Sequence, residues 1–156
     1  MTSDVKDVGF LLCASNDKLV TAESCTGGRI ATCITEIAGA SSWFAGGWVT
    51  YSNALKMSQL GVAEELLQMN GAVSSQVAEA MCVGAIRQSG ATVALSTTGI
   101  AGPTGGTEDK PVGTVFIGCV RASEIEVRRF LFSGNRIDVQ KQATIAALKL
   151  LHELFS

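Results

Sequence analysis

Histidine is almost absent from this sequence of 156 residues, because His152, close to the carboxyl end, is the only one. A Ser-His-Asp or Cys-His triad would have to use that residue, and a histidine on a terminal helix is usually solvated instead. The scarcity also disfavours a metal site built from histidine, and no group of carboxylates has the spacing of metal ligands. We therefore expect no metal, no other cofactor and no catalytic histidine.

Excess charge of one sign and long apolar runs are also lacking. Twelve Lys and Arg residues stand against 14 Asp and Glu residues, which gives a net charge of −2. The chain thus has no basic surface of the kind that nucleic acid binding requires. No segment reaches the roughly 18 consecutive apolar residues of a membrane span, and the first residues do not follow the pattern of a signal peptide. We expect a cytoplasmic protein that binds neither nucleic acid nor membrane.

The cysteines do not follow a disulfide or metal-binding pattern. They are five in number, which is odd, and none forms a CxxC pair. Four of them lie in apolar segments, so we interpret the set as reduced core residues. The five are Cys13, Cys25, Cys33, Cys82 and Cys119.

The hydrophobic pattern is that of an α/β protein. Apolar residues at helical spacing alternate with short, nearly unbroken apolar runs, which are typical of strands covered on both faces. The last two strands are close in sequence and therefore antiparallel. We expect a single three-layer α/β/α domain with a mixed β-sheet over residues 1–156. Helices are expected at 4–14, at 25–38 with Gly39 as its end, in two short pieces around Gly61, at 74–89 and at 135–155; strands are expected at 18–22, 48–51, 91–97, 112–120 and 124–132.

Two consecutive glycines, Gly27 and Gly28, stand at the junction between a strand and a helix. The helix expected over 25–38 includes both in its first turn, where a glycine costs about 1 kcal/mol relative to alanine. Such glycines are typical of places where a backbone or a ligand approaches closely. Ser24, just ahead of them, is therefore a candidate nucleophile, although a serine here is also a common helix N-cap. Cys25 is either an alternative nucleophile or a small buried side chain.

A serine nucleophile needs a base, and without histidine the candidates are a lysine, a carboxylate or a tyrosine. The segment YSNALK supplies the only tyrosine of the chain, Tyr51, and Lys56 five residues later. If the tyrosine ends a strand and the lysine lies in the first turn of the next helix, both face the same sheet edge as Ser24. Open α/β folds bind ligands at that edge. The alternative is a tyrosine that anchors the core and a lysine that is solvated.

The segment from Thr97 to Thr114 contains five glycines and two prolines, too many for a helix or a strand. It matches neither the Walker pattern nor the dinucleotide-binding pattern. Its bare amides are suited to a phosphate or an oxyanion, and Thr98 to a polar substrate, unless the segment is a disordered surface loop. Arg136, at the start of the last helix, is suited to bind a phosphate or a carboxylate unless it is simply solvated.

Four stretches of the sequence together resemble the CinA C-terminal domain family. This family includes the carboxyl-terminal domain of the competence and damage-inducible protein CinA and stand-alone nicotinamide mononucleotide deamidases. The stretches are AESCTGG, GGWVTYSNALK followed by LGV, GAVS, and TTGIAGPTGG with KPVGTV. The resemblance implies a metal-independent amidohydrolase that converts nicotinamide mononucleotide and water to nicotinate mononucleotide and ammonia in NAD recycling.

The resemblance also implies a role for each matched residue. Ser24 corresponds to the nucleophile, and Tyr51 and Lys56 to the residues that relay its proton. The residues that correspond to substrate contacts are Thr26, Gly27, Gly28, Ser41, Asn53, Thr98, Gly99, Gly102 and Arg136. The family further implies a small-molecule substrate, a homodimer and a cytoplasmic location. A catalytically inactive module that binds or senses pyridine nucleotides would use the same glycine-rich segments, and ammonia release separates these two interpretations.

Overall fold

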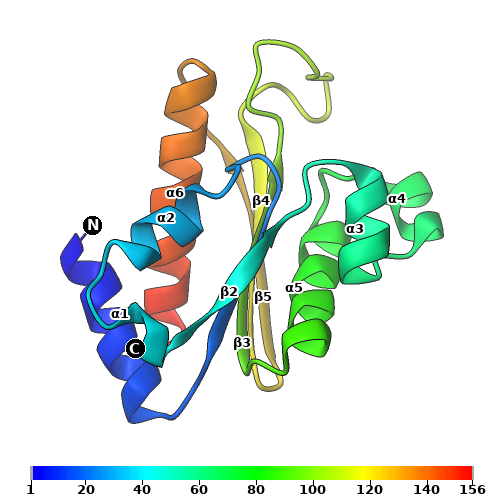
Figure 1. The fold of residues 1–156 in the computed structure, drawn as a ribbon. Coiled ribbons are helices and arrows are strands. Elements are labelled where there is room, and N and C mark those ends of the chain that lie inside the picture. The colour runs from blue at the N-terminus through cyan, green and yellow to red at the C-terminus, as the bar shows by residue number, and fades with distance from the viewer. Residues whose placement is uncertain (1, 156) are drawn as a thin grey trace.

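The computed structural model describes residues 2–155, and its helices and strands alternate as the sequence predicts (Figure 1). Residues 1 and 156, the ends of the expected domain, lie outside the described residues. The helices are α1 (Thr2–Ala14), α2 (Arg29–Thr35), the short 3-10 helix η1 (Ala40–Ser42), α3 (Asn53–Leu60), α4 (Glu64–Asn70), α5 (Ser75–Ser89) and α6 (Arg136–Glu153). The strands are β1 (Leu19–Glu23), β2 (Phe44–Val49), β3 (Val93–Gly99), β4 (Thr114–Arg121) and β5 (Glu124–Leu131).

The strands of the described residues form one mixed sheet in the order β2-β1-β3-β4-β5. β1 runs parallel to both β2 and β3, whereas β4 is antiparallel to β3 and β5. The connection between β4 and β5 is only two residues long, which forces that pair to be antiparallel. The carboxyl ends of the three parallel strands therefore lie side by side at one edge of the sheet.

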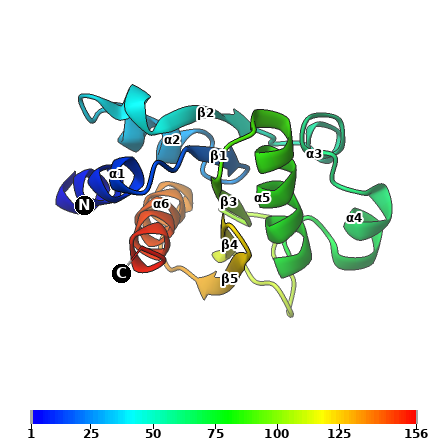
Figure 2. The same cartoon turned by 90° about the horizontal axis from the view of Figure 1, so that it is seen from below.

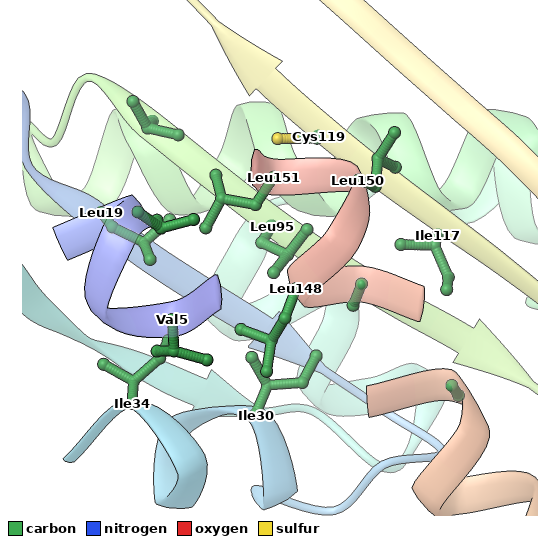
Figure 3. Close-up of a cluster of buried hydrophobic side chains, with 14 of the residues drawn as sticks. Val5, Leu19, Ile30, Ile34, Leu95, Ile117, Cys119, Leu148, Leu150 and Leu151 are labelled. Carbon is green, nitrogen blue, oxygen red and sulfur yellow. The ribbon is translucent and has the colours of Figure 1, made fainter. Parts of the chain in front are cut away.

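Helices cover both faces of the sheet. α1, α2 and α6 lie on one face, and α3, α4 and α5 lie on the other (Figures 1 and 2). Successive strand residues alternate between the two cores, because strand side chains point to opposite faces in turn. Leu19 and Leu95 pack against α1, α2 and α6 (Figure 3), whereas Val20 and Ala94 pack with the α5 side. The expected three-layer α/β/α fold with a mixed sheet is confirmed.

The helix predicted over 25–38 is wrong in its bounds, because α2 begins only at Arg29 and has seven residues. Gly27 and Gly28 have φ angles of +59° and +97°, and the Arg29 amide donates a hydrogen bond to the Thr26 carbonyl across them. Two consecutive positive φ angles inside such a hydrogen bond define a turn that favours glycine at both positions. The glycines are therefore required by the turn that precedes the helix.

Other predicted boundaries also differ from the structure, by a few residues for β3, β4 and α6 and more for the segments around Gly39 and β2. Gly39 does not end a helix; its φ is +85° and it caps the start of η1. The strand predicted over 48–51 is β2, which begins at Phe44 and ends before Tyr51. Its two central glycines weaken the apolar pattern at its start, and glycine-rich strands are poorly predicted by composition.

The cysteines are all free, but not all belong to the core. Cys25, Cys82 and Cys119 are buried as predicted, Cys33 is half-buried, and Cys13 is exposed. The prediction of a buried Cys13 is wrong, because the helical period of α1 turns its neighbour Leu12 toward the sheet and Cys13 away from it.

Candidate active site

A cleft opens where the parallel strands end. Ser24 directly follows β1, Tyr51 and Lys56 follow β2, and Thr98 lies one residue before the end of β3. The cleft has a volume of about 240 Å³. It is lined by Ser24, Cys25, Tyr51, Asn53, Lys56, Ala72, Val73, Thr98, Gly99 and Ala101. The topology thus brings the three residues expected to be catalytic to one place.

Ser24 and Lys56 form a buried pair. Lys56 Nζ donates hydrogen bonds to Ser24 Oγ at 3.0 Å and to the Thr50 carbonyl at 2.9 Å. The lysine is 2% exposed, and none of the ion pairs between described residues involves it. Burial lowers the pKa of Lys56, because it disfavours the charged form. The alternative of a solvated lysine is therefore wrong, and the pair has the geometry of a nucleophile and its base.

The structure also separates the two candidate nucleophiles. The N-cap of α2 is Gly28, so Ser24 does not cap that helix and its hydroxyl is directed at Lys56. Burial raises the pKa of the Cys25 thiol to about 12, and the nearby Glu23 carboxylate adds to this effect. A thiol that keeps its proton is a poor nucleophile. Of the two interpretations of Cys25, an alternative nucleophile or a small buried side chain, the structure supports the second.

The backbone amides at the amino end of α2 donate hydrogen bonds to a side chain of the protein itself. The amides of Ile30 and Ala31 donate to the Glu23 carboxylate, and the Thr26 hydroxyl donates to it as well. The family resemblance implies substrate contacts from Thr26, Gly27 and Gly28 beside this helix end, but the helix amides already have an internal acceptor. Thr26 is 1% exposed and, together with Gly27 and Gly28, does not line the cleft.

Tyr51 and Arg136 meet at the rim of the cleft. One Arg136 nitrogen, Nη2, donates to the Tyr51 hydroxyl at 2.5 Å, and the other, Nη1, donates to the Gly102 carbonyl at 2.6 Å. The tyrosine is 58% exposed, so it does not anchor the core. The loop after β3 is also tied to the Asn70 carbonyl by the Lys110 ammonium. These contacts argue against the alternative of a disordered surface loop.

Of the remaining expected substrate contacts, Asn53, Thr98 and Gly99 line the cleft and Ser41 does not. The Thr98 hydroxyl donates to the Ala72 carbonyl at 2.8 Å, so only its acceptor capacity is available to a ligand. Ser41 lies in η1, ahead of the first residue of β2, whereas Ser24 lies beyond the last residue of the parallel strand β1. A five-residue strand separates the two ends by roughly 15 Å, which places Ser41 outside this cleft.

Sequence reasoning assigned no role to several residues at the site. Ala72 and Val73 line the cleft and belong to the GAVS stretch, which was noted only as part of the resemblance. Gln140 donates from α6 to the Cys25 carbonyl at 3.1 Å and has no local signal that would reveal this contact. Glu23 directly follows the strand expected over 18–22, and a carboxylate between that strand and the glycine turn is the signal that could have identified it.

A larger groove lies elsewhere on the molecule. Its volume is about 780 Å³, and Phe10, Cys33 and Trp43 are among its lining residues on α1, on α2 and after η1. It contains no pair comparable to Ser24 and Lys56, so size alone does not identify the site. Among residues 5–155, whose side chains the structure describes, no three His, Cys, Asp or Glu are grouped to hold a metal ion. In the same residues no helix has the length and apolar character that crossing a membrane requires.

The fold and the cleft define a class of protein. It is a three-layer α/β protein with a buried serine–lysine pair at the carboxyl ends of its parallel strands. Comparison with known proteins specifies this class further. The chain belongs to the CinA C-terminal domain family, whose model matches residues 2–155.

Relatives and solved structures agree with that assignment. The chain is 49% identical over 151 residues to the nicotinamide-nucleotide amidohydrolase PncC of Escherichia coli (strain K12). The matched segment covers 96% of this chain and 92% of that protein. It is 50% identical over 139 residues to the PncC of Pseudomonas putida, covering 89% and 87%. A crystal structure of a CinA superfamily protein from Enterobacter cloacae superimposes with a TM-score of 0.96 at 31% identity, covering 99% of this chain and 92% of that one. The family resemblance drawn from the sequence is confirmed.

Proposed function

We propose that the protein is a nicotinamide-nucleotide amidohydrolase that converts nicotinamide mononucleotide and water to nicotinate mononucleotide and ammonia. The observation that carries this proposal is the buried hydrogen bond of 3.0 Å between Lys56 Nζ and Ser24 Oγ. Relatives that are 49% and 50% identical and are named nicotinamide-nucleotide amidohydrolases support the choice of substrate.

In this mechanism Ser24 Oγ attacks the amide carbon of the nicotinamide group, and neutral Lys56 Nζ accepts the hydroxyl proton. The backbone amide of Cys25, the one residue of the turn after Ser24 that lines the cleft, stabilises the oxyanion of the tetrahedral intermediate. Lys56 then gives the proton to the amide nitrogen as the carbon–nitrogen bond breaks and ammonia leaves. A water molecule, deprotonated by the same amine, hydrolyses the acyl ester and restores the serine.

Tyr51 and Arg136 hold the part of the substrate that extends outside the cleft. The volume of about 240 Å³ is below the roughly 300–1,000 Å³ of pockets that enclose a whole ligand. The nicotinamide group therefore occupies the cleft, and the ribose phosphate lies over the rim. Arg136 uses two of its five N–H donors on Tyr51 and Gly102, which leaves three for a phosphate. Lys56 is the base, because it is the direct hydrogen-bond partner of Ser24. Tyr51 helps to hold the substrate at the rim of the cleft.

The purified chain is expected to release ammonia and nicotinate mononucleotide in equal amounts from nicotinamide mononucleotide, at a rate that a metal chelator does not change. The reason is that every proposed step uses a side chain or backbone amide of the protein. A coupled ammonia assay with chromatography of the nucleotide measures both products. Activity lost to a chelator and restored by a divalent ion contradicts the mechanism, and substrate binding without ammonia release indicates the regulatory module instead.

The Arg136→Gln variant is expected to raise the KM for nicotinamide mononucleotide by about 10-fold or more, the effect of one lost charged hydrogen bond. The KM for nicotinamide riboside, which has no phosphate, should change by less than about 2-fold if the guanidinium acts on the phosphate alone. Steady-state kinetics on both substrates measure the difference. An equal change for both substrates would show that Arg136 acts through Tyr51 or Gly102 and not on the phosphate.

We further propose that the protein works in the cytoplasm as a homodimer. The five free cysteines support a reducing compartment. The strand β2 lies at an edge of the sheet, and its last residue Val49 is 48% exposed, a combination that favours association. Analytical ultracentrifugation of the purified chain is expected to give the mass of two copies, and a monomer at all concentrations would contradict the proposal.

A further inference from the structure

A buried carboxylate next to the nucleophile has no step in the mechanism above. Glu23, the last residue of β1, is 1% exposed. Its Oε1 accepts from the Thr26 hydroxyl at 2.6 Å and from the Ile30 amide at 3.0 Å, and its Oε2 accepts from the Ala31 amide at 3.1 Å. None of the ion pairs between described residues involves Glu23. Three neutral donors and the amino end of α2 therefore stabilise this carboxylate.

The hydrogen bonds around Glu23 have one direction only. Thr26 Oγ1 lies 2.8 Å from Thr97 Oγ1 on β3, and both side chains are buried. A hydroxyl has a single proton, and Thr26 uses its proton on Glu23, so Thr97 must donate to Thr26. The result is a chain of hydrogen bonds from Thr97 through Thr26 to Glu23. Rotation of any one member leaves a buried polar group unpaired, which is costly.

This chain of hydrogen bonds holds the turn that carries the nucleophile. The Thr97 carbonyl accepts from the Ser24 amide at 3.0 Å, so Thr97 contacts the turn through its backbone as well as its side chain. The Gly27 amide donates to the Ser24 carbonyl at 3.1 Å, which places Thr26 inside the same turn. Displacement of Thr26 therefore displaces Ser24 relative to the lysine.

We propose that Glu23 is a positioning residue for the nucleophile. Glu23 acts through Thr26 and Thr97 to keep Ser24 Oγ within hydrogen-bonding distance of Lys56. The inference rests on the proposed function, because it concerns the serine–lysine pair on which that function depends. The same contacts direct the carboxylate toward α2. The lysine is consequently left without an ionised partner that would retain its proton.

The test compares two variants of one residue. Thr26→Val keeps the shape of the side chain and removes the hydroxyl, whereas Thr26→Ser keeps the hydroxyl. We expect kcat to fall by about 100-fold in Thr26→Val, the effect of a misplaced reacting group, with KM unchanged within about 2-fold. Thr26→Ser should recover kcat to within about 3-fold of the wild type. Thr35→Val, the same substitution on the exposed side of α2, is the matched control and should leave kcat unchanged.

Glu23→Gln tests the acceptor itself. Its amide group places an N–H donor against one of the helix amides, so the same loss of kcat at constant KM is expected. If this variant does not fold, the Thr26 pair decides. If the wild type is active and kcat is undiminished in Thr26→Val, the inference is overturned. The inference is also overturned if kcat falls as far in Thr26→Ser as in Thr26→Val, or if Thr26→Val changes only KM. A wild type that releases no ammonia instead rejects the proposed function itself.

Discussion

Ser24→Ala is expected to lower ammonia release from nicotinamide mononucleotide by at least about 1,000-fold while the substrate still binds. In the proposed mechanism the hydroxyl forms the bond to the amide carbon, so its removal affects the transition state and not the holding of the nucleotide. The side chain is 8% exposed and loses a single oxygen atom, so the fold should be retained. Single-turnover kinetics and calorimetric binding measure the two quantities separately.

The neighbouring thiol provides the decisive comparison. If Ser24→Ala retained a near-native rate and Cys25→Ala were inactive, the nucleophile would be the thiol, in spite of its pKa of about 12. A Ser24→Ala variant that no longer bound the substrate would contradict the division between bond making and binding.

Lys56→Met is expected to lower kcat by at least about 100-fold, the effect typical of a lost general base. Methionine keeps the apolar shape of this buried side chain and removes the amine. Lys56→Arg should not restore activity, because a guanidinium keeps its proton. His152→Ala, in the last turn of α6, is the control and should have a nearly unchanged rate. Near-normal kcat in Lys56→Met together with a collapse in His152→Ala would reject the serine–lysine mechanism.

The pH profile gives a second measurement on the same variant. Burial lowers the pKa of Lys56 below 10.5, the ordinary value for lysine, so the amine becomes neutral at a lower pH than in a free side chain. In the wild type, kcat/KM should therefore rise with pH until Lys56 has lost its proton. Lys56→Met should lack this rise.

The Lys56→Met substitution should change stability and activity in opposite directions. Between the lowered pKa of Lys56 in the folded protein and 10.5 in the unfolded chain, the unfolded chain binds more protons, so stability rises with pH in that window. At neutral pH the folded protein must either hold a buried ammonium or release its proton, and both are unfavourable. Lys56→Met removes this cost and should raise Tm by about 2–4 °C for each kcal/mol gained. Differential scanning calorimetry at pH 7 measures the shift.

The amino-acid sequence by itself determined the fold class and the place of the candidate site. Helical spacing and unbroken apolar runs report burial through a local period, so the alternation of helices and strands and the buried β3 and β4 could be predicted. Because the chain has a single histidine, the candidate bases are a lysine, a carboxylate or a tyrosine. The motif order around Ser24, Tyr51 and Lys56 identified the family, because those stretches are local and contiguous.

Several features of the site could not be predicted from local patterns. The positive φ angles that require Gly27 and Gly28 depend on the turn geometry, and the sequence suggested a longer helix instead. Ser41 fell outside the cleft because the direction of β2 separates it from the strand ends. Glu23 faces the amino end of α2 only because that helix folds back over the strand.

Only the tertiary structure decided which side chains work together. The hydrogen bond between Lys56 and Ser24 joins residues 32 positions apart in sequence, and the hydrogen bond between Arg136 and Tyr51 joins residues 85 positions apart. Such contacts depend on strand order and register, which bring the ends of β1, β2 and β3 together. From its neighbours in sequence alone, Lys56 could equally be predicted to be a solvated lysine on a helix surface. It is buried here because the turn after β1 and the end of β2 close over it, and that arrangement exists only in the folded chain.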